Sequence, residues 1–329
     1  MIERLPLRPV LFSLLALGVA TGVALAVAAS AGFEAVGDVF ARVDPVWLAV
    51  VAGGQLVGLL GYVLTYRVFG GMADGEKLPP PLAARLVAAG FGAFTIGGGF
   101  ALDHRALEAS GRDRRSARIR VLTLGALEYV VLAPAACLSA IVLVVTGTHA
   151  NGTLLWPWIV LVPAGFALAI WASARRERLT RGRRGKRKRL DEALCVLGDL
   201  RNFHSDPAHY AEAVLGMILY WCGEIVSLWA ALHTFGANIA VPTIVLAYAT
   251  GYAATRRTLP LGGAGATEAL MTFALHWVGL SIPTAFAGVV VYRFFNFAVV
   301  TPPALQARAS LERAFRTGTA DGTRRSAAA

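Results

Sequence analysis

The sequence predicts an all-α, polytopic membrane protein with about six full crossings and two oppositely oriented re-entrant hairpins that form an inverted repeat. Of its 329 residues, 56% are hydrophobic and 16% are charged, and the mean hydropathy is +0.60; a soluble domain carries about 25% charged residues. Residues 12–31 and 154–174 contain no charged residue, and each run has about the 20 residues needed to cross a bilayer as a helix. Because lipid leaves no backbone polar group unpaired and no alternating strand pattern is present, the crossings are predicted to be helical.

The apolar runs define the predicted crossings. They are expected over about residues 11–31, 46–68, 121–145, 154–174, 213–235 and 285–305. The first run is too long for a signal peptide and lacks a cleavage site, so we interpret it as a helix. Two further apolar segments, 81–107 and 242–278, contain glycine clusters that interrupt them.

The distribution of basic residues predicts the orientation. The segment 175–189 holds ten Lys or Arg and one acid, and further arginines precede the third crossing and follow the sixth. The positive-inside rule therefore places these loops and both termini in the cytoplasm. The interrupted segments must then enter and leave from opposite sides of the membrane, which is typical of inverted repeats. A pair of short full crossings in each segment would give the same parity.

These assignments divide the chain as follows. A transmembrane domain is expected over 1–310, with repeats at about 45–147 and 211–305. A basic cytoplasmic loop with a surface helix is expected over 175–209, and a disordered cytoplasmic tail over 311–329. The Ala-, Arg- and Gly-rich composition favours a bacterial plasma membrane.

Two glycine-rich stretches match each other in the two predicted hairpins. The matching positions are Gly97 with Gly262, Gly98 with Gly263, Asp103 with Glu268, and Glu128 with Arg293. Glycine lets a helix break and another group approach closely, and the helix that restarts offers unpaired N–H groups that an acid in its first turn complements. The alternative is that these glycines only allow close helix packing.

Ionisable residues at membrane depth are candidate binding residues, because burying them in lipid is costly. Beyond the matched positions, the candidates are Glu224, Arg256 and Arg257. Guanidinium groups suit a lipid phosphate, and the acids suit a cationic headgroup or a transported proton. Alternatively, Glu224 and Glu268 form buried ion pairs that fix helix packing, Arg256 and Arg257 are partners of Glu268, and Asp103 lies at the membrane surface.

Metal and nucleic-acid sites are not expected. Cys137, Cys195 and Cys222 show no CxxC spacing, and the six histidines are scattered without ligand spacing, so we predict no metal and no cofactor. The net charge of +11 is carried by loops between apolar runs, which favours contact with anionic lipid at the cytoplasmic face over contact with nucleic acid.

The stretch 262–268, followed by Tyr292-Arg293, resembles the lysylphosphatidylglycerol synthase transmembrane region, also called the flippase-like membrane family. Members show a Pro-Gly-Gly-x-Gly-x-x-Glu stretch and a Tyr-Arg pair in the last helix, and the resemblance covers about residues 11–305. The chain departs from this pattern with Leu261 where Pro is frequent, Asp103 where Glu is commoner, and Tyr129 where Arg is frequent. These departures concern mainly the first hairpin.

The resemblance implies a role in moving lipids. Its best-known members fuse this region to a cytoplasmic aminoacyl transferase domain, which the few residues after the sixth crossing are too short to form, so no enzyme activity is expected. A lipid flippase or scramblase is the leading hypothesis. The alternatives are a secondary transporter of a small polar solute, and a non-transporting membrane partner of a lipid- or glycan-modifying enzyme. The chain is also a candidate homo-oligomer.

Overall fold

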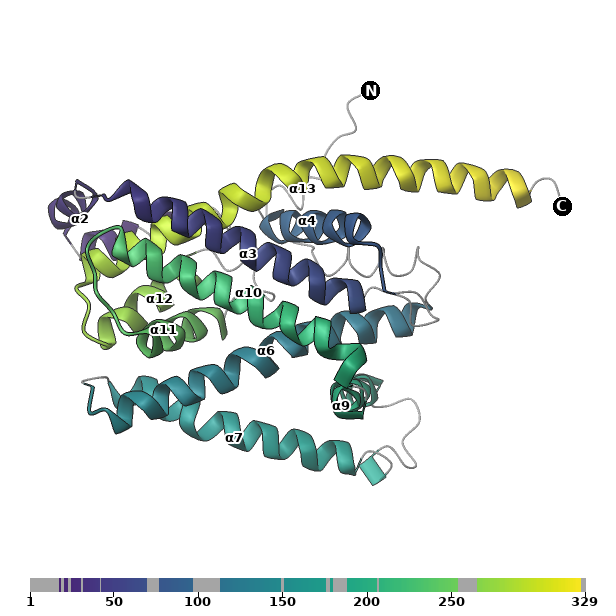
Figure 1. Cartoon of the computed structure of the whole chain (residues 1–329), viewed down its shortest axis with the longest axis horizontal. Coiled ribbons are helices and arrows are strands. Elements are labelled where there is room, and N and C mark those ends of the chain that lie inside the picture. The colour runs from purple at the N-terminus through teal and green to yellow at the C-terminus, as the bar shows by residue number, and fades with distance from the viewer. Residues whose placement is uncertain are drawn as a thin grey trace.

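The computed structural model describes most of the chain, and all the regular secondary structure in the part it describes is helical. The described residues are 18, 21–22, 25–30, 32–41, 43–69, 77–96, 113–148, 151–175, 178–179, 188–205, 207–253 and 265–326. The labelled helices are α2 (Phe33–Phe40), α3 (Pro45–Phe69), α4 (Pro80–Ile96), α6 (Arg114–Val145), α7 (Gly152–Ala174), α9 (Lys188–Ser205), α10 (Pro207–His233), α11 (Val241–Ala253), α12 (Ala266–Trp277) and α13 (Ile282–Ser326). Figure 1 shows that the long helices run roughly side by side.

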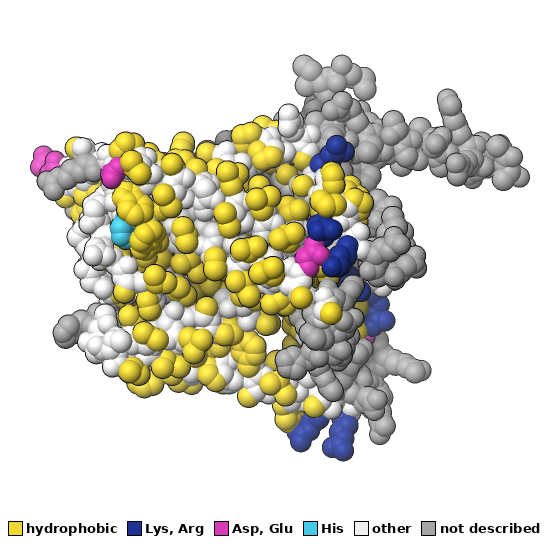
Figure 2. Space-filling view, viewed as in Figure 1, with side chains coloured by type: hydrophobic (Ala, Val, Ile, Leu, Met, Phe, Trp, Pro, Cys, Tyr) yellow, Lys and Arg dark blue, Asp and Glu magenta, His cyan; other side chains and the backbone are white. Residues whose placement is uncertain are grey.

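Five of the described helices are long and apolar enough to cross a membrane. They are α3, α6, α7, α10 and α13. They match five of the six predicted crossings, and a multi-pass helical membrane protein is therefore confirmed. The first predicted crossing, 11–31, falls largely outside the described residues. In Figure 2 apolar side chains cover the middle of the face shown, as expected of a surface that meets lipid.

The two ends of the bundle differ in charge. At one end, Arg67 and Lys77 both pair with Glu212, at 2.6 and 2.7 Å. Arg115 pairs with Asp191 at the same end. We call this the basic end, and Figure 2 shows its dark-blue side chains gathered at one edge.

The other end is joined by backbone contacts between turns. Asp44 N–H donates to Thr234 O at 3.0 Å, and Asn151 N–H donates to Trp277 O at 3.2 Å. We call this the opposite end. In Figure 1 it also holds α2.

The helices α3 and α10 form the central pair of the bundle and pack on each other more extensively than any other two helices. They run antiparallel, because Thr65 Oγ1 donates to Ala213 O and Ser227 Oγ donates to Val51 O, each at 2.9 Å. Small residues let the two backbones approach closely, as they do in membrane helix pairs.

The contacts between α3 and α10 are reciprocal. A residue of α3 and the residue 162 positions later in α10 play the same part: Thr65 matches Ser227, and Val51 matches Ala213. The glycines follow the same rule. A Cβ on Gly216 would lie 2.5 Å from Gly61 O, and one on Gly54 would lie 2.7 Å from Gly223 O. The pair therefore has a local two-fold symmetry.

The short helices occupy opposite ends of the bundle. Helix α4 packs on α13 and α3 in the half that carries the basic end, whereas α11 and α12 pack on each other towards the opposite end. The two predicted interrupted segments thus hold short helices, with α11 and α12 flanking residues 254–264. Residues 97–112, which follow α4, lie outside the described residues.

Several boundaries differ from the sequence expectation. Helix α6 starts at Arg114, seven residues before the predicted crossing, because the Asp113 side chain caps it by accepting from the N–H groups of Arg115 and Ser116. Helix α13 continues to Ser326 through most of the segment predicted to be a disordered tail. The Ala, Leu, Glu and Arg residues between 304 and 316 are strong helix formers, which explains the continuation.

Candidate functional site

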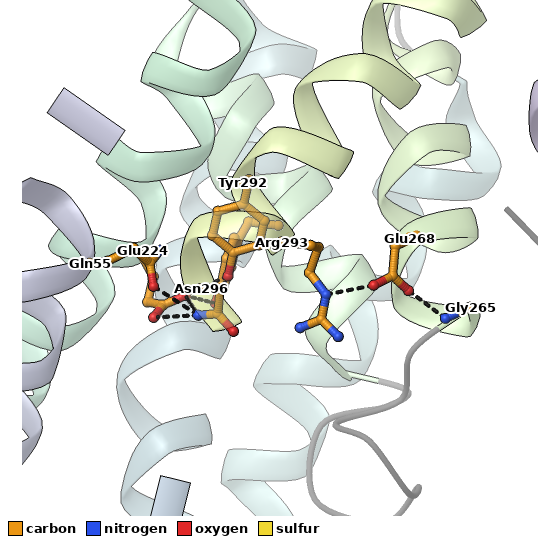
Figure 3. Close-up of polar contacts among 8 residues, drawn as sticks. Gln55, Glu224, Gly265, Glu268, Tyr292, Arg293 and Asn296 are labelled. Carbon is orange, nitrogen blue, oxygen red and sulfur yellow. Dashed lines mark hydrogen bonds and ion pairs between the residues drawn. The ribbon is translucent and has the colours of Figure 1, made fainter. Parts of the chain in front are cut away.

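A buried polar network lies among α3, α6, α10, α11, α12 and α13. It contains three of the acids that the sequence analysis singled out, each in a different setting. Five of its members, Gln55, Glu128, Glu224, Arg293 and Asn296, are at most 8% exposed, and the side chain of Glu268 is 14% exposed. Figure 3 shows most of the network.

The carboxyl of Glu224 on α10 is surrounded by neutral side chains. Tyr248 donates a hydrogen bond to Oε2 at 3.0 Å, and Tyr292 donates a short one to the same oxygen. Asn296 Nδ2 lies 3.3 Å from Oε1 and also donates to Gln55 Oε1 at 2.8 Å. We call Gln55, Tyr248, Tyr292 and Asn296 the Glu224 cage.

Helical spacing explains how this cage forms. Tyr292 and Asn296 are four residues apart on α13, so both lie on the same face and reach the same carboxyl. Tyr248 and Tyr252 have the same spacing on α11, and their rings stack with centroids 6.1 Å apart. The second tyrosine of that pair therefore extends the network one turn further along α11.

Glu128 on α6 occupies the next position of the network. It is fully buried, and Tyr252 donates a hydrogen bond to its Oε2 at 2.5 Å. The Trp221 ring packs edge-on against Tyr252 and Tyr248, and its indole N–H donates to the Glu128 backbone oxygen at 3.1 Å. Trp221 thus holds the α6 and α11 parts of the network together.

Glu268 and Arg293 form an ion pair at the start of α12. Arg293 Nε donates to Glu268 Oε1 at 2.6 Å, and the two side chains are 8% and 14% exposed. The other carboxylate oxygen accepts from the Gly265 N–H at 2.5 Å, so Glu268 satisfies an unpaired donor at the start of α12. Gly265 has a φ of +89°, a conformation that favours glycine.

The network offers two kinds of chemistry. The guanidinium of Arg293 suits an anionic group. The carboxyl of Glu224 suits a cation or a proton, because its hydrogen-bond partners are neutral. Arg293 is one residue from Tyr292, so α13 carries both functions on adjacent positions (Figure 3). Among the described residues, no group of three His, Cys, Asp or Glu side chains is placed to hold a metal.

The structure brings four predicted site residues into one region. Glu128, Glu224, Glu268 and Arg293 all belong to the network. The other seven lie outside the described residues: Gly97, Gly98, Asp103, Arg256, Arg257, Gly262 and Gly263. Glu268 pairs with Arg293, as the ion-pair alternative expected, whereas no described cation lies within ion-pair distance of Glu224.

Sequence reasoning missed the neutral members of the site. Gln55, Tyr248, Tyr252 and Asn296 are uncharged and occur within apolar helices, so they gave no signal on a charge criterion. A polar amide inside a membrane span is itself costly to bury. A search for amide side chains within apolar runs would have identified Gln55 in α3 and Asn296 in α13.

Comparison with known proteins agrees with the fold. A family model described as the lysylphosphatidylglycerol synthase TM region matches residues 13–304. A search of curated proteins finds no match to the chain. The matched range includes every described residue of the polar network.

Proposed function

Because the chain belongs to the lysylphosphatidylglycerol synthase transmembrane-region family, a membrane domain of lipid-related proteins, we propose that it moves a phospholipid or related lipid between the two leaflets. The proposal is for a flippase or scramblase without an enzymatic step of its own. The observation that carries it is the buried Arg293–Glu268 pair next to the Glu224 cage. Ionisable groups are retained at membrane depth mainly where they serve a transport or relay function.

The arrangement of the short helices supports an alternating-access mechanism. The local symmetry of α3 and α10, together with α4 at one end and α11 and α12 at the other, is the pattern expected of an inverted repeat. In such a transporter one half rocks against the other around a central site. We therefore place the lipid headgroup at the start of α12, with its phosphate near Arg293.

Headgroup binding at this site requires the internal ion pair to open. Arg293 already donates to Glu268, so an incoming phosphate must compete with that carboxylate. If the headgroup carries an amine, Glu268 becomes its partner and both charges remain neutralised. This exchange favours zwitterionic headgroups over purely anionic ones.

Reconstitution in liposomes with fluorescent lipids tests the proposal. The protein is expected to equilibrate a labelled lipid between leaflets, and Glu268→Gln and Arg293→Ala are each expected to slow it at least about tenfold, a loss of about 1.4 kcal/mol of stabilisation. Glu212→Gln is the matched control. It removes an ion-pair acid that is 21% exposed and lies at the basic end, twelve residues before Glu224 on α10, with Arg67 and Lys77 as its partners.

The outcomes separate the candidate functions. Unchanged lipid movement in both site variants would reject these residue roles. Uptake of a small polar solute by liposomes with static lipids would favour a secondary transporter. No transport by the isolated protein, together with stoichiometric co-purification of a lipid- or glycan-modifying enzyme, would favour a non-transporting partner.

A further inference from the structure

Glu224 is a buried acid whose described hydrogen-bond partners are all neutral side chains. It is 2% exposed, and its hydrogen bonds come from two phenols and an amide. Among the described residues, no Lys, Arg or His lies within 4.0 Å of it, whereas Glu268 and Glu212 each have such a partner. A buried carboxylate without a counter-ion carries a large desolvation cost, which uptake of a proton removes.

The Glu224 cage can satisfy both protonation states. A phenol both donates and accepts, and its O–H rotates to suit its neighbour. When Glu224 is ionised, Tyr248 and Tyr292 donate to it; when it is protonated, one of these hydroxyls can instead accept. Tyr292 already has Tyr248 Oη within 3.2 Å as an alternative acceptor.

The amides of the cage add donors for the ionised state. Asn296 Nδ2 bonds Gln55 Oε1 and lies near Glu224, while Gln55 Nε2 is buried and has no hydrogen-bond acceptor within normal bonding geometry among the described residues. The cage therefore holds more donors than its present contacts use. A lysine or arginine at one of these positions would instead lock the carboxyl in its charged form.

The titratable and charged groups around Glu224 come from several elements. Tyr248 on α11 and Tyr292 on α13 bond its carboxyl, Arg293 follows Tyr292 on α13, and Tyr220 lies beside it on α10. Tyr252 on α11 and Glu128 on α6 form the next part of the network. Of these, only Arg293 is cationic, and its Nε bonds Glu268. The arginine is thus already engaged by another carboxylate.

We propose that Glu224 is a proton-binding site whose occupancy is coupled to the Arg293–Glu268 pair through α13. This inference rests on the proposed transport function and deepens it, because it names the ion that drives or gates lipid movement. Loss of the proton leaves a second carboxylate close to Arg293, and the two acids then compete for one guanidinium. Tyr292 and Asn296, which bond Glu224, and Arg293, which bonds Glu268, all lie on α13. Competition between Glu224 and Glu268 for Arg293 therefore shifts α13 relative to α12.

Infrared spectroscopy of the purified protein tests proton binding without a transport assay. A protonated carboxyl has a C=O band that a carboxylate lacks, so titration from about pH 4 to about pH 9 follows its occupancy. We expect a titrating band that is absent in Glu224→Gln and retained in Glu192→Gln. Glu192 is a matched control because it is another buried acid, 3% exposed, on α9.

A second variant tests the proposal independently, in case Glu224→Gln does not fold. Tyr248→Phe keeps the carboxyl but removes one donor to its ionised form, so the midpoint of the same band is expected to move to higher pH by about one unit or more. An identical titration in wild type, Glu224→Gln and Tyr248→Phe would overturn the proposal.

Transport assays then separate this inference from the proposed function. In liposomes with a pH difference across the membrane, wild-type lipid movement is expected to depend on the gradient, and Glu224→Gln is expected to lose that dependence. Lipid movement that ignores pH in wild type would overturn the coupling while leaving the lipid function intact. A Glu224-dependent titration without any lipid movement would reject the proposed function and keep the proton site.

Discussion

The Arg293–Glu268 pair is enclosed by α12 and α13, with 8% and 14% of its side chains exposed. Removing one partner leaves a buried charge without its counter-ion, which costs about 3–5 kcal/mol in such settings. We therefore expect Arg293→Gln and Glu268→Gln each to lower the thermal unfolding midpoint clearly in detergent.

The double variant is expected to cost less than the two single losses together, because it removes both charges. Fluorescence-detected unfolding of the four proteins measures this coupling. Additive losses would show that the two side chains act independently despite the 2.6 Å contact.

Gly265 sets the start of α12. Its φ of +89° strains any residue with a Cβ, so Gly265→Ala is expected to destabilise the protein by about 1–3 kcal/mol. Gly165→Ala on α7 is the control, because its Cβ would meet nothing within 4 Å. Equal unfolding midpoints in the two variants would contradict the assigned backbone conformation.

Residues of the site could be predicted where charge marked them. Glu128, Glu224, Glu268 and Arg293 stood out as ionisable groups in apolar runs, and the structure places all four in one network. Their partners could not be predicted, because which helix faces which depends on tertiary packing that one sequence does not record. The pairing of Glu268 with Arg293 is such a case.

At the scale of the element, the most extensive contact between two described helices is that between α3 and α10. A Cβ on Gly61 would lie 2.5 Å from both Gly216 O and Tyr220 N, and these backbone atoms can move only if the helices separate. Gly61→Ala is therefore expected to destabilise the protein by about 1–3 kcal/mol.

Gly53 provides a matched control on the same helix. Its Cβ would meet nothing within 4 Å, so Gly53→Ala is expected to be neutral or to stabilise the helix by up to about 1 kcal/mol. Thermal unfolding in one detergent compares the two variants. A larger loss for Gly53→Ala than for Gly61→Ala would contradict the packing described for this pair.

The stability of the start of α6 is expected to depend on pH through the Asp113 cap. Hydrogen bonds from the Ser116 side chain and from the Ser116 and Arg115 N–H groups lower the pKa of Asp113 below its ordinary value. The cap therefore stabilises α6 above the unfolded pKa of about 4 and loses this effect as pH falls through the lower, folded pKa. We expect Asp113→Ala to lower the unfolding midpoint near neutral pH, with the difference from wild type shrinking in strong acid. A constant difference would exclude a charged cap.

Element boundaries show where sequence patterns are weakest. The apolar run predicted α7 to within a few residues, because its hydrophobic limits coincide with the Asn151 cap and Arg175. The same criterion could not predict the extension of α13 to Ser326, since helix propensity continues after hydrophobicity ends.

On the scale of the whole molecule, the two ends of the bundle differ in charge and in the short helices they hold. The basic end carries Arg67, Lys77 and Arg115, and the opposite end joins Asn151 to Trp277 through a backbone hydrogen bond. We infer that the basic end faces the cytoplasm, because positive residues are retained there during insertion.

The proposed inverted repeat makes a topological prediction about the interrupted segments. Lys77 and Arg114 flank the first segment, and Asn238 and Ser281 flank the second; all four are exposed. If each segment returns to the side from which it entered, cysteines at the first two positions react only with reagent applied from the cytoplasmic side, and cysteines at the last two only from the outer side. The test requires a background without Cys137, Cys195 and Cys222. If the two cysteines that flank one segment were labelled from different sides of the membrane, the inverted repeat would be ruled out.

The same labelling distinguishes a re-entrant hairpin from two short full crossings. Both give the same parity at the flanking positions, so the turn between them must be tested, and a cysteine at position 98 lies in the glycine-rich stretch of the first segment. A full crossing exposes that stretch to reagent on the outer side, whereas a re-entrant hairpin shields it, because irregular backbone at membrane depth is tolerated only where it is buried in protein or lines a polar cavity. We expect protection from the outer side and slow reaction from the cytoplasmic side. Rapid outer labelling would replace the first hairpin with a pair of short crossings while leaving the polar network and its proton site unchanged.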